Sequence, residues 1–185
     1  MHRAWVAAVV VGVSSILLAS PAAARTDWSP AAKRAPAGQR GLTALEAQVL
    51  SEVNGARRQR GLRPLRLSTQ LSHAAAYHSR DMARRGYFSH TSAGGTEFWR
   101  RVQRFYASRG FRHWAVGENL LWSSPDVNSS TALSMWMASP PHRANLLSRR
   151  WREVGLAAVH VGAGPGVFGG HEVTIVTANF GSRTR

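Results

Sequence analysis

The sequence predicts an α+β domain in which helices come first and strands mostly come later. Apolar residues recur at helical spacing between residues 43 and 110. Two segments with alternating or β-branched residues, 153–161 and 171–180, are typical of strands, and a glycine-rich loop at 162–170 joins them. Helical segments followed by strands indicate an α+β domain with a small antiparallel sheet.

The length of 185 residues accommodates one domain of about 150 residues plus an appendage. Residues 1–24 are predicted to be a signal peptide: His2 and Arg3 form a basic start, "AWVAAVVVGVSSILLA" is apolar, and small residues lead to a cleavage site after about Ala24. The apolar run is short for a membrane span and no second run follows, so we expect secretion without a stable span after cleavage. An uncleaved amino-terminal anchor is the alternative.

Residues 25–42, "RTDWSPAAKRAPAGQRGL", are rich in Pro, Ala, Gly and Arg without periodicity. This composition predicts a disordered linker. The folded domain is therefore expected over residues 43–185, with no internal repeat.

The first two helices carry clear boundary signals. Thr43 and Glu46 match a capping box, and apolar residues follow at helical spacing until Gly61. The second helix is predicted from about Ser68 to Gly86. On its apolar stripe lies His78, which we interpret as a hydrogen-bonded core histidine.

The following segments are less regular. Thr96 is a candidate N-cap for a third helix that would end at Gly110. The apolar stretch 114–122, "WAVGENLLW", is typical of a strand, and residues 126–138 suit a fourth helix.

A proline pair interrupts the next helical stretch, "WMASPPHRANLL". Pro140 disfavours the α conformation at Ser139, so one helix ends there and Ser139 can cap the next. His142 then falls in the first turn of the new helix, where the helix dipole disfavours an added positive charge. We therefore expect a neutral imidazole, the form that can bind a metal or act as a base.

The chain has 24 Lys and Arg residues against 9 Asp and Glu, a formal net charge of +15, and Lys33 is its one lysine. Genomic base composition alone can produce this bias. If the charge is functional, it would draw an exported protein to an anionic wall polymer or to lipid headgroups, whereas scattered arginines and an extracellular destination argue against nucleic acid. Cysteine is absent, so the core must stabilise the domain without disulfides.

The sequence lacks a Cys nucleophile, G-x-S-x-G, H-E-x-x-H, a P-loop and G-x-G-x-x-G, which excludes several large enzyme classes. Four candidate site residues remain, namely His90, Glu118, His142 and Glu153. Glu118 is the strongest of these candidates, because a carboxylate is unexpected in an apolar strand. His90, Glu118 and His142 together would suit a divalent ion such as zinc, and a His/Glu pair could equally transfer protons without metal.

Six blocks in order resemble the bacterial secreted, cysteine-free branch of the CAP superfamily, which includes cysteine-rich secretory proteins, antigen 5 and plant pathogenesis-related proteins. The blocks are "VNGARRQRGLRPL", "LSHAAAYHSRDMARRGYFSHTS", "VGENLLW", "MWMASPPHRANLL", "WREVGLA" and "VTANFG", and they span about residues 44–182.

The resemblance implies an α-β-α sandwich, with a small, mainly antiparallel sheet between helical layers. It also implies a cleft lined by two histidines and two acids that binds a divalent metal in some relatives. His90, Glu118 and His142 match family positions, and Glu153 is a looser match for the second acid. Ser139 stands where the eukaryotic pattern has glutamate, and Arg150 stands near its second histidine.

Three functions compete at this point. An extracellular module could bind a lipid, a wall component or a divalent metal through the cleft. A metal-dependent or acid/base hydrolase could act on an extracellular peptide or wall polymer through His90, Glu118 and His142. Alternatively, the polar cluster satisfies itself inside the sandwich and has only a structural role. The first reading, without catalysis, is preferred.

Overall fold

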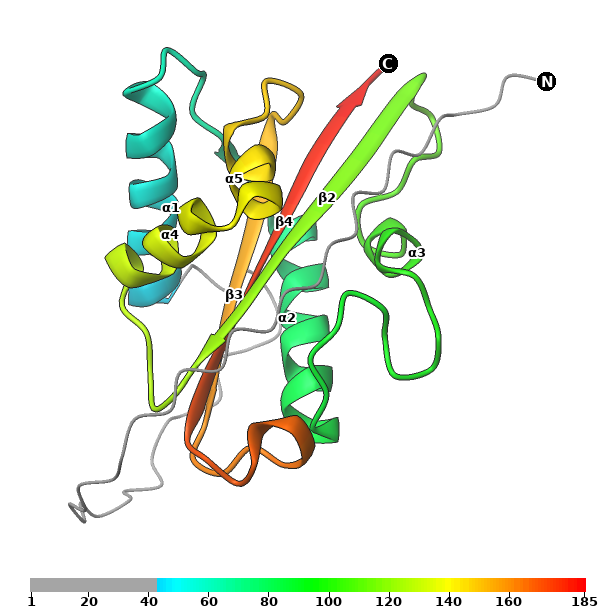
Figure 1. Ribbon diagram of the computed structural model, residues 1–185. Helices are drawn as coiled ribbons and strands as arrows, with labels where there is room; N and C mark the ends of the chain where they lie inside the picture. Colours follow the sequence, from blue (N-terminus) through cyan, green and yellow to red (C-terminus); the bar gives the residue numbers. More distant parts are fainter. Residues whose placement is uncertain (1–42) are drawn as a thin grey trace.

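The computed structural model describes residues 43–185 (Figure 1), so the predicted signal peptide and linker lie outside the described residues. Helix α1, Ala44–Arg58, begins at the predicted capping box: the Thr43 side chain accepts from the Glu46 N–H, and the Glu46 side chain accepts from the Thr43 N–H. Helix α2, Thr69–Arg85, begins at Ser68 and ends at Gly86, which has a left-handed φ of 69°. Both boundary predictions for α2 are confirmed.

Helix α3, Phe98–Gln103, is shorter than predicted. Its N-cap is Glu97 and not Thr96, and the helix does not continue to Gly110. Beyond the end of the helix, the Tyr106 carbonyl accepts a hydrogen bond from Trp114 Nε1 at 2.9 Å.

The proline pair separates two helices as predicted. Helix α4, Ser129–Ala138, starts after the N-cap Asn128 and not at residue 126, because the Asn128 side chain accepts from the Thr131 N–H. Ser139 is extended, with ψ 116°, and helix α5, Pro140–Leu147, follows it. Ser139 occupies the predicted N-cap position, although its side chain makes no capping bond.

The described residues form a four-stranded sheet in the order β1-β3-β4-β2. Strands β2, His113–Ser123, and β3, Glu153–Val161, each pair antiparallel with the central β4, Val173–Thr184. Strand β1, Arg66–Leu67, adds a short parallel pair with β3 and was not predicted, because two residues carry no readable period. A short 3₁₀ helix, Gly166–Phe168, lies in the glycine-rich loop between β3 and β4.

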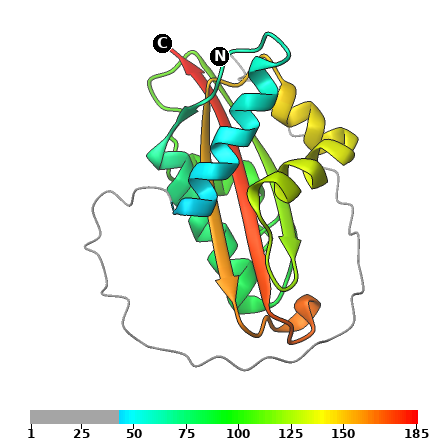
Figure 2. The same ribbon diagram turned by 90° about the vertical axis from the view of Figure 1, so that its left-hand side faces the viewer.

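Helices cover both faces of the sheet, which confirms the expected α-β-α sandwich with a mainly antiparallel sheet (Figure 2). Helices α1, α4 and α5 pack on one face around Trp136, Leu146 and Phe180. Helices α2 and α3 cover the other face through residues such as Leu71, Met82 and Phe98. Among residues 43–185, no helix is long and apolar enough to cross a bilayer.

The α2 layer lies unusually close to β3 at Gly155. A Cβ atom built there would stand 2.0 Å from the Ser72 nitrogen and 2.1 Å from the Leu71 carbonyl carbon. Only glycine allows this approach, and it sets the depth of α2 above the sheet. That depth matters for the site, because α2 and the loop after it contribute two of the histidines described next.

Candidate functional site

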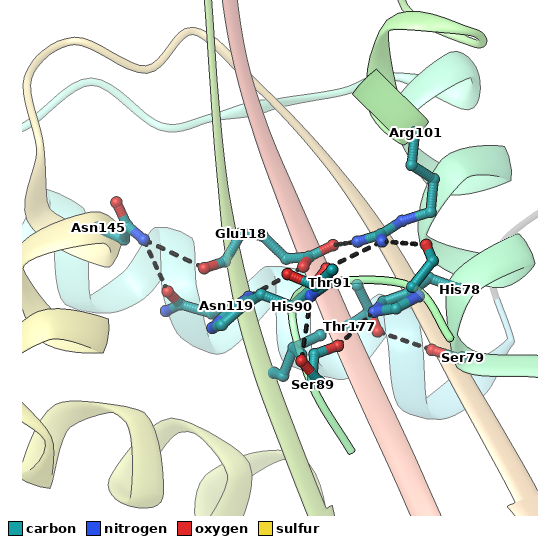
Figure 3. Close-up of polar contacts among 12 residues, drawn as sticks. His78, Ser79, Ser89, His90, Thr91, Arg101, Glu118, Asn119, Asn145 and Thr177 are labelled. Carbon is teal, nitrogen blue, oxygen red and sulfur yellow. Dashed lines mark hydrogen bonds and ion pairs between the residues drawn. The ribbon is translucent and has the colours of Figure 1, made fainter. Parts of the chain in front are cut away.

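A buried carboxylate, Glu118, lies at the centre of a polar cluster on the α2–α3 face of the sheet (Figure 3). Its Oε1 accepts from His90 Nδ1 at 2.9 Å, and its Oε2 accepts from an Arg101 guanidinium nitrogen at 2.7 Å. In the amide orientation that satisfies both of its ends, Asn179 on β4 also donates to Oε2, at 2.9 Å, and accepts from the Ala75 N–H. Both carboxylate oxygens are therefore occupied by protein donors.

The charge on Glu118 is stabilised inside the protein. Burial alone would raise the pKa of Glu118, but the positive charge of Arg101 and the hydrogen bond from His90 more than offset this effect and hold the pKa below its ordinary value. Arg101 and Glu118 are both about 1% exposed, so this ion pair is fully withdrawn from solvent. Glu118 is consequently an ionised acceptor at neutral pH.

The loop that carries His90 is held on both sides of this residue. His78 Nε2 bonds to the Ser89 carbonyl at 2.8 Å, which requires the proton to be on Nε2. Arg101 donates to the His90 carbonyl and to the Ser92 hydroxyl, each at 2.9 Å. The position of His90 thus depends on α2 through His78 and on α3 through Arg101.

The contact with Glu118 also sets the tautomer of His90. An ionised carboxylate can only accept, so His90 Nδ1 carries the proton and Nε2 carries a lone pair when the ring is neutral. No described residue bonds to Nε2, and this atom is not among the buried unpaired atoms, so it is open to solvent. His90 therefore presents one basic nitrogen to the outside.

His142 comes to the same region from the opposite helical layer. The Asn119 amide donates to the His142 carbonyl at 3.0 Å, and Asn145 donates to the Asn119 amide oxygen at 3.0 Å. These bonds fasten α5 to β2 directly beside Glu118. The ring of His142 is half-buried and bonds to no described side chain.

The neutral state predicted for His142 agrees with its surroundings. Partial burial, and then the charge that His90 carries when protonated, lower the pKa of His142. His90 and His142 therefore influence each other electrostatically, although no hydrogen bond joins the two rings. The structure therefore bonds His90 directly to the buried Glu118, whereas His142 lies on α5, whose backbone is tied to β2 beside Glu118.

Neighbouring residues of β2 explain the local sequence "GEN". Glu118 points toward α2 and α3, whereas Gly117 and Asn119 point toward α5. A Cβ at Gly117 would lie 2.7 Å from the Trp151 ring, so glycine makes room for this side chain. Strand β2 is an edge strand, and Asn145 and Trp136 donate to its Glu118 and Leu120 carbonyls, which covers the exposed edge.

Glu153, the looser candidate for a second acid, does not join this cluster. It opens β3 opposite Gly181, and β4 separates it from β2. Its carboxylate accepts from the Tyr106 hydroxyl at 2.6 Å and lies 3.7 Å from Arg66. The expectation that Glu153 lies with His90 and Glu118 was wrong, because its position at the start of β3 turns it toward the end of α3.

His78 is confirmed as a buried, hydrogen-bonded core histidine. Burial lowers the pKa of His78 to about 4, so the ring is neutral at physiological pH. Its Nδ1 is buried without a partner among the described residues. His78 is thus part of the cluster's support and is withdrawn from any ligand.

The donor set around Glu118 does not make a complete metal site. Within residues 43–185, no group of three or more His, Cys, Asp or Glu side chains is arranged to hold a metal ion. Glu118 is engaged with Arg101, whose positive charge disfavours a cation at the same oxygen. Two imidazoles remain, which is fewer than the three protein ligands usual for catalytic zinc.

Sequence reasoning missed Arg101, Asn119, Asn145 and Asn179, although the signal that identified Glu118 applies to two of them. Asn119 and Asn179 are also polar residues inside apolar strands. Arg101 follows Phe98 by three residues, so a helical reading places it on the buried face of α3. A buried arginine there requires an acidic or carbonyl partner.

Comparisons with known proteins agree with this fold. A family model described as CAP, the cysteine-rich secretory protein family, matches residues 50–180. The uncharacterized protein YkwD of Bacillus subtilis is 28% identical over 145 residues, which cover 78% of this chain and 53% of that protein. This chain therefore spans about half the length of that curated relative.

Two solved structures are similar over most of the chain. An extracellular, SCP-domain-containing protein from Bacillus anthracis has a TM-score of 0.57 at 26% identity, covering 80% of this chain and 45% of that one. An outer surface protein of Borrelia burgdorferi has a TM-score of 0.58 at 19% identity, covering 74% of this chain and 90% of that one. The second likeness concerns the fold alone.

Proposed function

We propose, from the premise that this chain belongs to the cysteine-rich secretory protein (CAP) family, that it is an extracellular binding module whose ligand contacts His90 and His142. The predicted signal peptide supports an extracellular location, as does the similar Bacillus anthracis protein, which is described as extracellular. The ligand classes that we propose are a wall component or a lipid with a polar headgroup.

One observation carries this proposal. Both oxygens of Glu118 are occupied by donors of the protein itself, so the carboxylate orients His90 and is not offered to a substrate. His90 Nε2 and the His142 ring are left facing solvent. Imidazole rings can form hydrogen bonds with hydroxyl, amide or phosphate groups.

A titration followed by NMR of the histidine rings tests the proposal. The probes are soluble peptidoglycan fragments, a long-chain fatty acid and zinc chloride, added separately to the purified chain. We expect one of the first two to shift the His90 and His142 signals while the exposed His73 on α2 stays unchanged. If His90 and His142 respond no more than His73 to every probe, the proposal is wrong.

The matched variants are His90→Ala/His142→Ala and His73→Ala. The double variant should lose the binding found in the titration, whereas His73→Ala should retain it. Zinc serves as the test of the metal hypothesis: identical zinc affinity in the double variant and the parent would exclude a site at these rings. Because only two imidazoles are free, we expect any zinc binding to be weak.

A second candidate, an acid/base hydrolase, is favoured by the 2.9 Å bond between His90 Nδ1 and Glu118 Oε1. This pairing leaves Nε2 able to take a proton from a water molecule, with Glu118 stabilising the resulting imidazolium. Turnover of peptidoglycan or a peptide library that disappears in a folded Glu118→Gln variant would support it. Turnover that is unchanged in that variant, or absent from the parent, would reject it.

A further inference from the structure

The end of the molecule opposite the β3–β4 loop carries arginines that have no carboxylate partner among residues 43–185. Two short segments meet there, residues 59–65 after α1 and residues 148–152 between α5 and β3, and both lie at the upper end of the sheet (Figures 1 and 2). Neither segment contains an acidic residue. Five of their arginines are exposed, and we call them the arginine surface: Arg60, Arg63, Arg149, Arg150 and Arg152.

A buried arginine holds the two segments together. Arg57, about 1% exposed, donates from Nε to the Arg63 carbonyl at 2.9 Å, and from one terminal nitrogen to the carbonyls of Leu146 and Ser148 at 2.6 and 3.1 Å. The second link is through the sheet, because the Arg66 N–H donates to the Arg152 carbonyl at 3.0 Å. The arginine surface is therefore one continuous part of the fold.

Positive charge in this region is uncompensated. Among the described residues, no carboxylate lies within 4 Å of Arg57 or of the arginine surface. Burial, and then the nearby charge of Arg152, lower the pKa of Arg57, which indicates that the guanidinium groups repel one another. An anion bound from solution would remove this repulsion.

Arginines on α2 differ in this respect. Arg84 and Arg85 lie 3.1 and 3.0 Å from Asp81, so these two charges share one carboxylate. The two groups lie at opposite ends of the sandwich, as the course of α2 in Figure 1 shows. A purely compositional bias would distribute arginines without regard to acids, whereas among the described residues one end of the sandwich has a carboxylate beside its arginines and the other has none.

We propose that the arginine surface binds an extended, phosphate-bearing polymer outside the cell, as a second contact separate from the His90 and His142 site. The planar guanidinium group donates two parallel hydrogen bonds to phosphate, and several adjacent guanidinium groups match a repeating anion. This inference goes beyond the proposed function and shares with it only the extracellular location.

The side chains that surround the arginines favour a polymer without bases or acyl chains. The large apolar residues of both segments, Leu62, Leu65 and Trp151, are buried, so neither segment presents a large apolar side chain for insertion into a lipid surface. Trp151 is also unavailable as a platform on which nucleic acid bases could stack. The exposed arginines of the two segments therefore suit a polymer that carries phosphate groups but no nucleic acid bases.

Long-chain inorganic polyphosphate is the probe, and its dissociation constant is measured against sodium chloride concentration. We compare Arg63→Gln/Arg149→Gln/Arg150→Gln with Arg80→Gln/Arg84→Gln/Arg85→Gln, which removes the same charge from α2. The first variant should bind about tenfold more weakly or worse, with a log–log salt slope smaller by about two to three, because each lost phosphate contact reduces it by about one. The control should stay within about threefold of the parent.

Equal weakening in both triple variants would overturn the proposal, because only net charge would then matter. Tighter binding to anionic phospholipid vesicles or to single-stranded DNA than to polyphosphate, through the same arginines, would also overturn it and assign the surface to a membrane or to nucleic acid. The His90→Ala/His142→Ala variant should keep parental polyphosphate affinity, so failure here is distinguishable from failure of the histidine site.

Discussion

Arg57 and Arg101 are buried to the same extent, about 1% exposed, but their guanidinium groups have different kinds of partner. Arg101 faces a carboxylate, Glu118, and the pair lies inside a network that also contains His90 and Asn179. Arg57 faces three backbone carbonyls, two of them at the end of α5, and no acid. Among residues 43–185, the Arg101 charge is balanced by a carboxylate, whereas the Arg57 charge is not.

The comparison teaches that burial of a cation does not by itself indicate a function. In the Arg101 network the guanidinium and the Glu118 carboxylate balance each other, and the group left with an unbonded ring nitrogen is His90. The carbonyls around Arg57 satisfy hydrogen bonds without supplying a full negative charge. Each of the following predictions tests one side of this contrast.

The largest effect is expected for Arg101→Leu. It leaves the Glu118 charge buried without a counter-ion, and removing one partner of a buried pair typically costs about 3–5 kcal/mol in the free energy of unfolding. Urea denaturation measures this loss. The double variant Arg101→Leu/Glu118→Gln should recover part of the lost free energy of unfolding, because it removes the unpaired charge as well. A loss below about 1 kcal/mol in Arg101→Leu alone would show that the Glu118 charge does not depend on Arg101 for its stabilisation.

Protonation of His78, which supports the same network, should make the free energy of unfolding depend on pH. Its folded pKa of about 4 lies below the ordinary value of 6.5, so the unfolded chain binds the proton first and stability falls as pH decreases from 6.5 toward 4. A shift of this size corresponds to at most about 3 kcal/mol at 1.36 kcal/mol per pKa unit.

Unfolding free energies measured between pH 7 and pH 4.5 test this prediction above the range in which protonation of Glu118 contributes. Protonation of Glu118 also lowers the free energy of unfolding. Because the folded pKa of Glu118 lies below its ordinary value, this loss begins only as the pH falls below the ordinary glutamate range. A His78→Gln variant should show a flatter profile. An unchanged slope would mean that another group titrates.

A smaller loss, about 2 kcal/mol, is expected for Arg57→Met. Three carbonyls lose their donor, but they lie near the surface segments and water can replace part of the hydrogen bonding. Denaturant unfolding at neutral pH gives the value. A cost equal to that of Arg101→Leu would contradict the distinction between carbonyl and carboxylate partners.

The smallest effect on stability is expected for His142→Ala. Its ring bonds to no described residue, and the Asn119 bond goes to its backbone, so the loss should stay below about 1 kcal/mol while ligand-induced ring shifts at His90 diminish. Thermal unfolding and the NMR titration check both parts. A loss of several kcal/mol would indicate that the polar cluster has only a structural role.

Much of the fold could be predicted from sequence because its signals are local. The Thr43–Glu46 capping box, the Ser68 and Gly86 boundaries of α2 and the break at Pro140 each depend on residues a few positions apart. The end of α3 could not be predicted in this way. The helix ends at Gln103, and the Tyr106 carbonyl beyond it accepts a hydrogen bond from Trp114 on β2, a contact that no local pattern encodes.

The sequence by itself determined the residue types of the site, since a carboxylate in an apolar strand and a histidine after a proline break are unusual wherever they lie. Only the tertiary structure decided which partners they meet. The register of β2 against β4 sets Glu118 opposite Asn179, and the position of Glu153 on β3 takes it away from them. Arg57 likewise joins two arginine segments that are almost ninety residues apart in the chain. Such contacts depend on packing between distant elements, which no local pattern encodes.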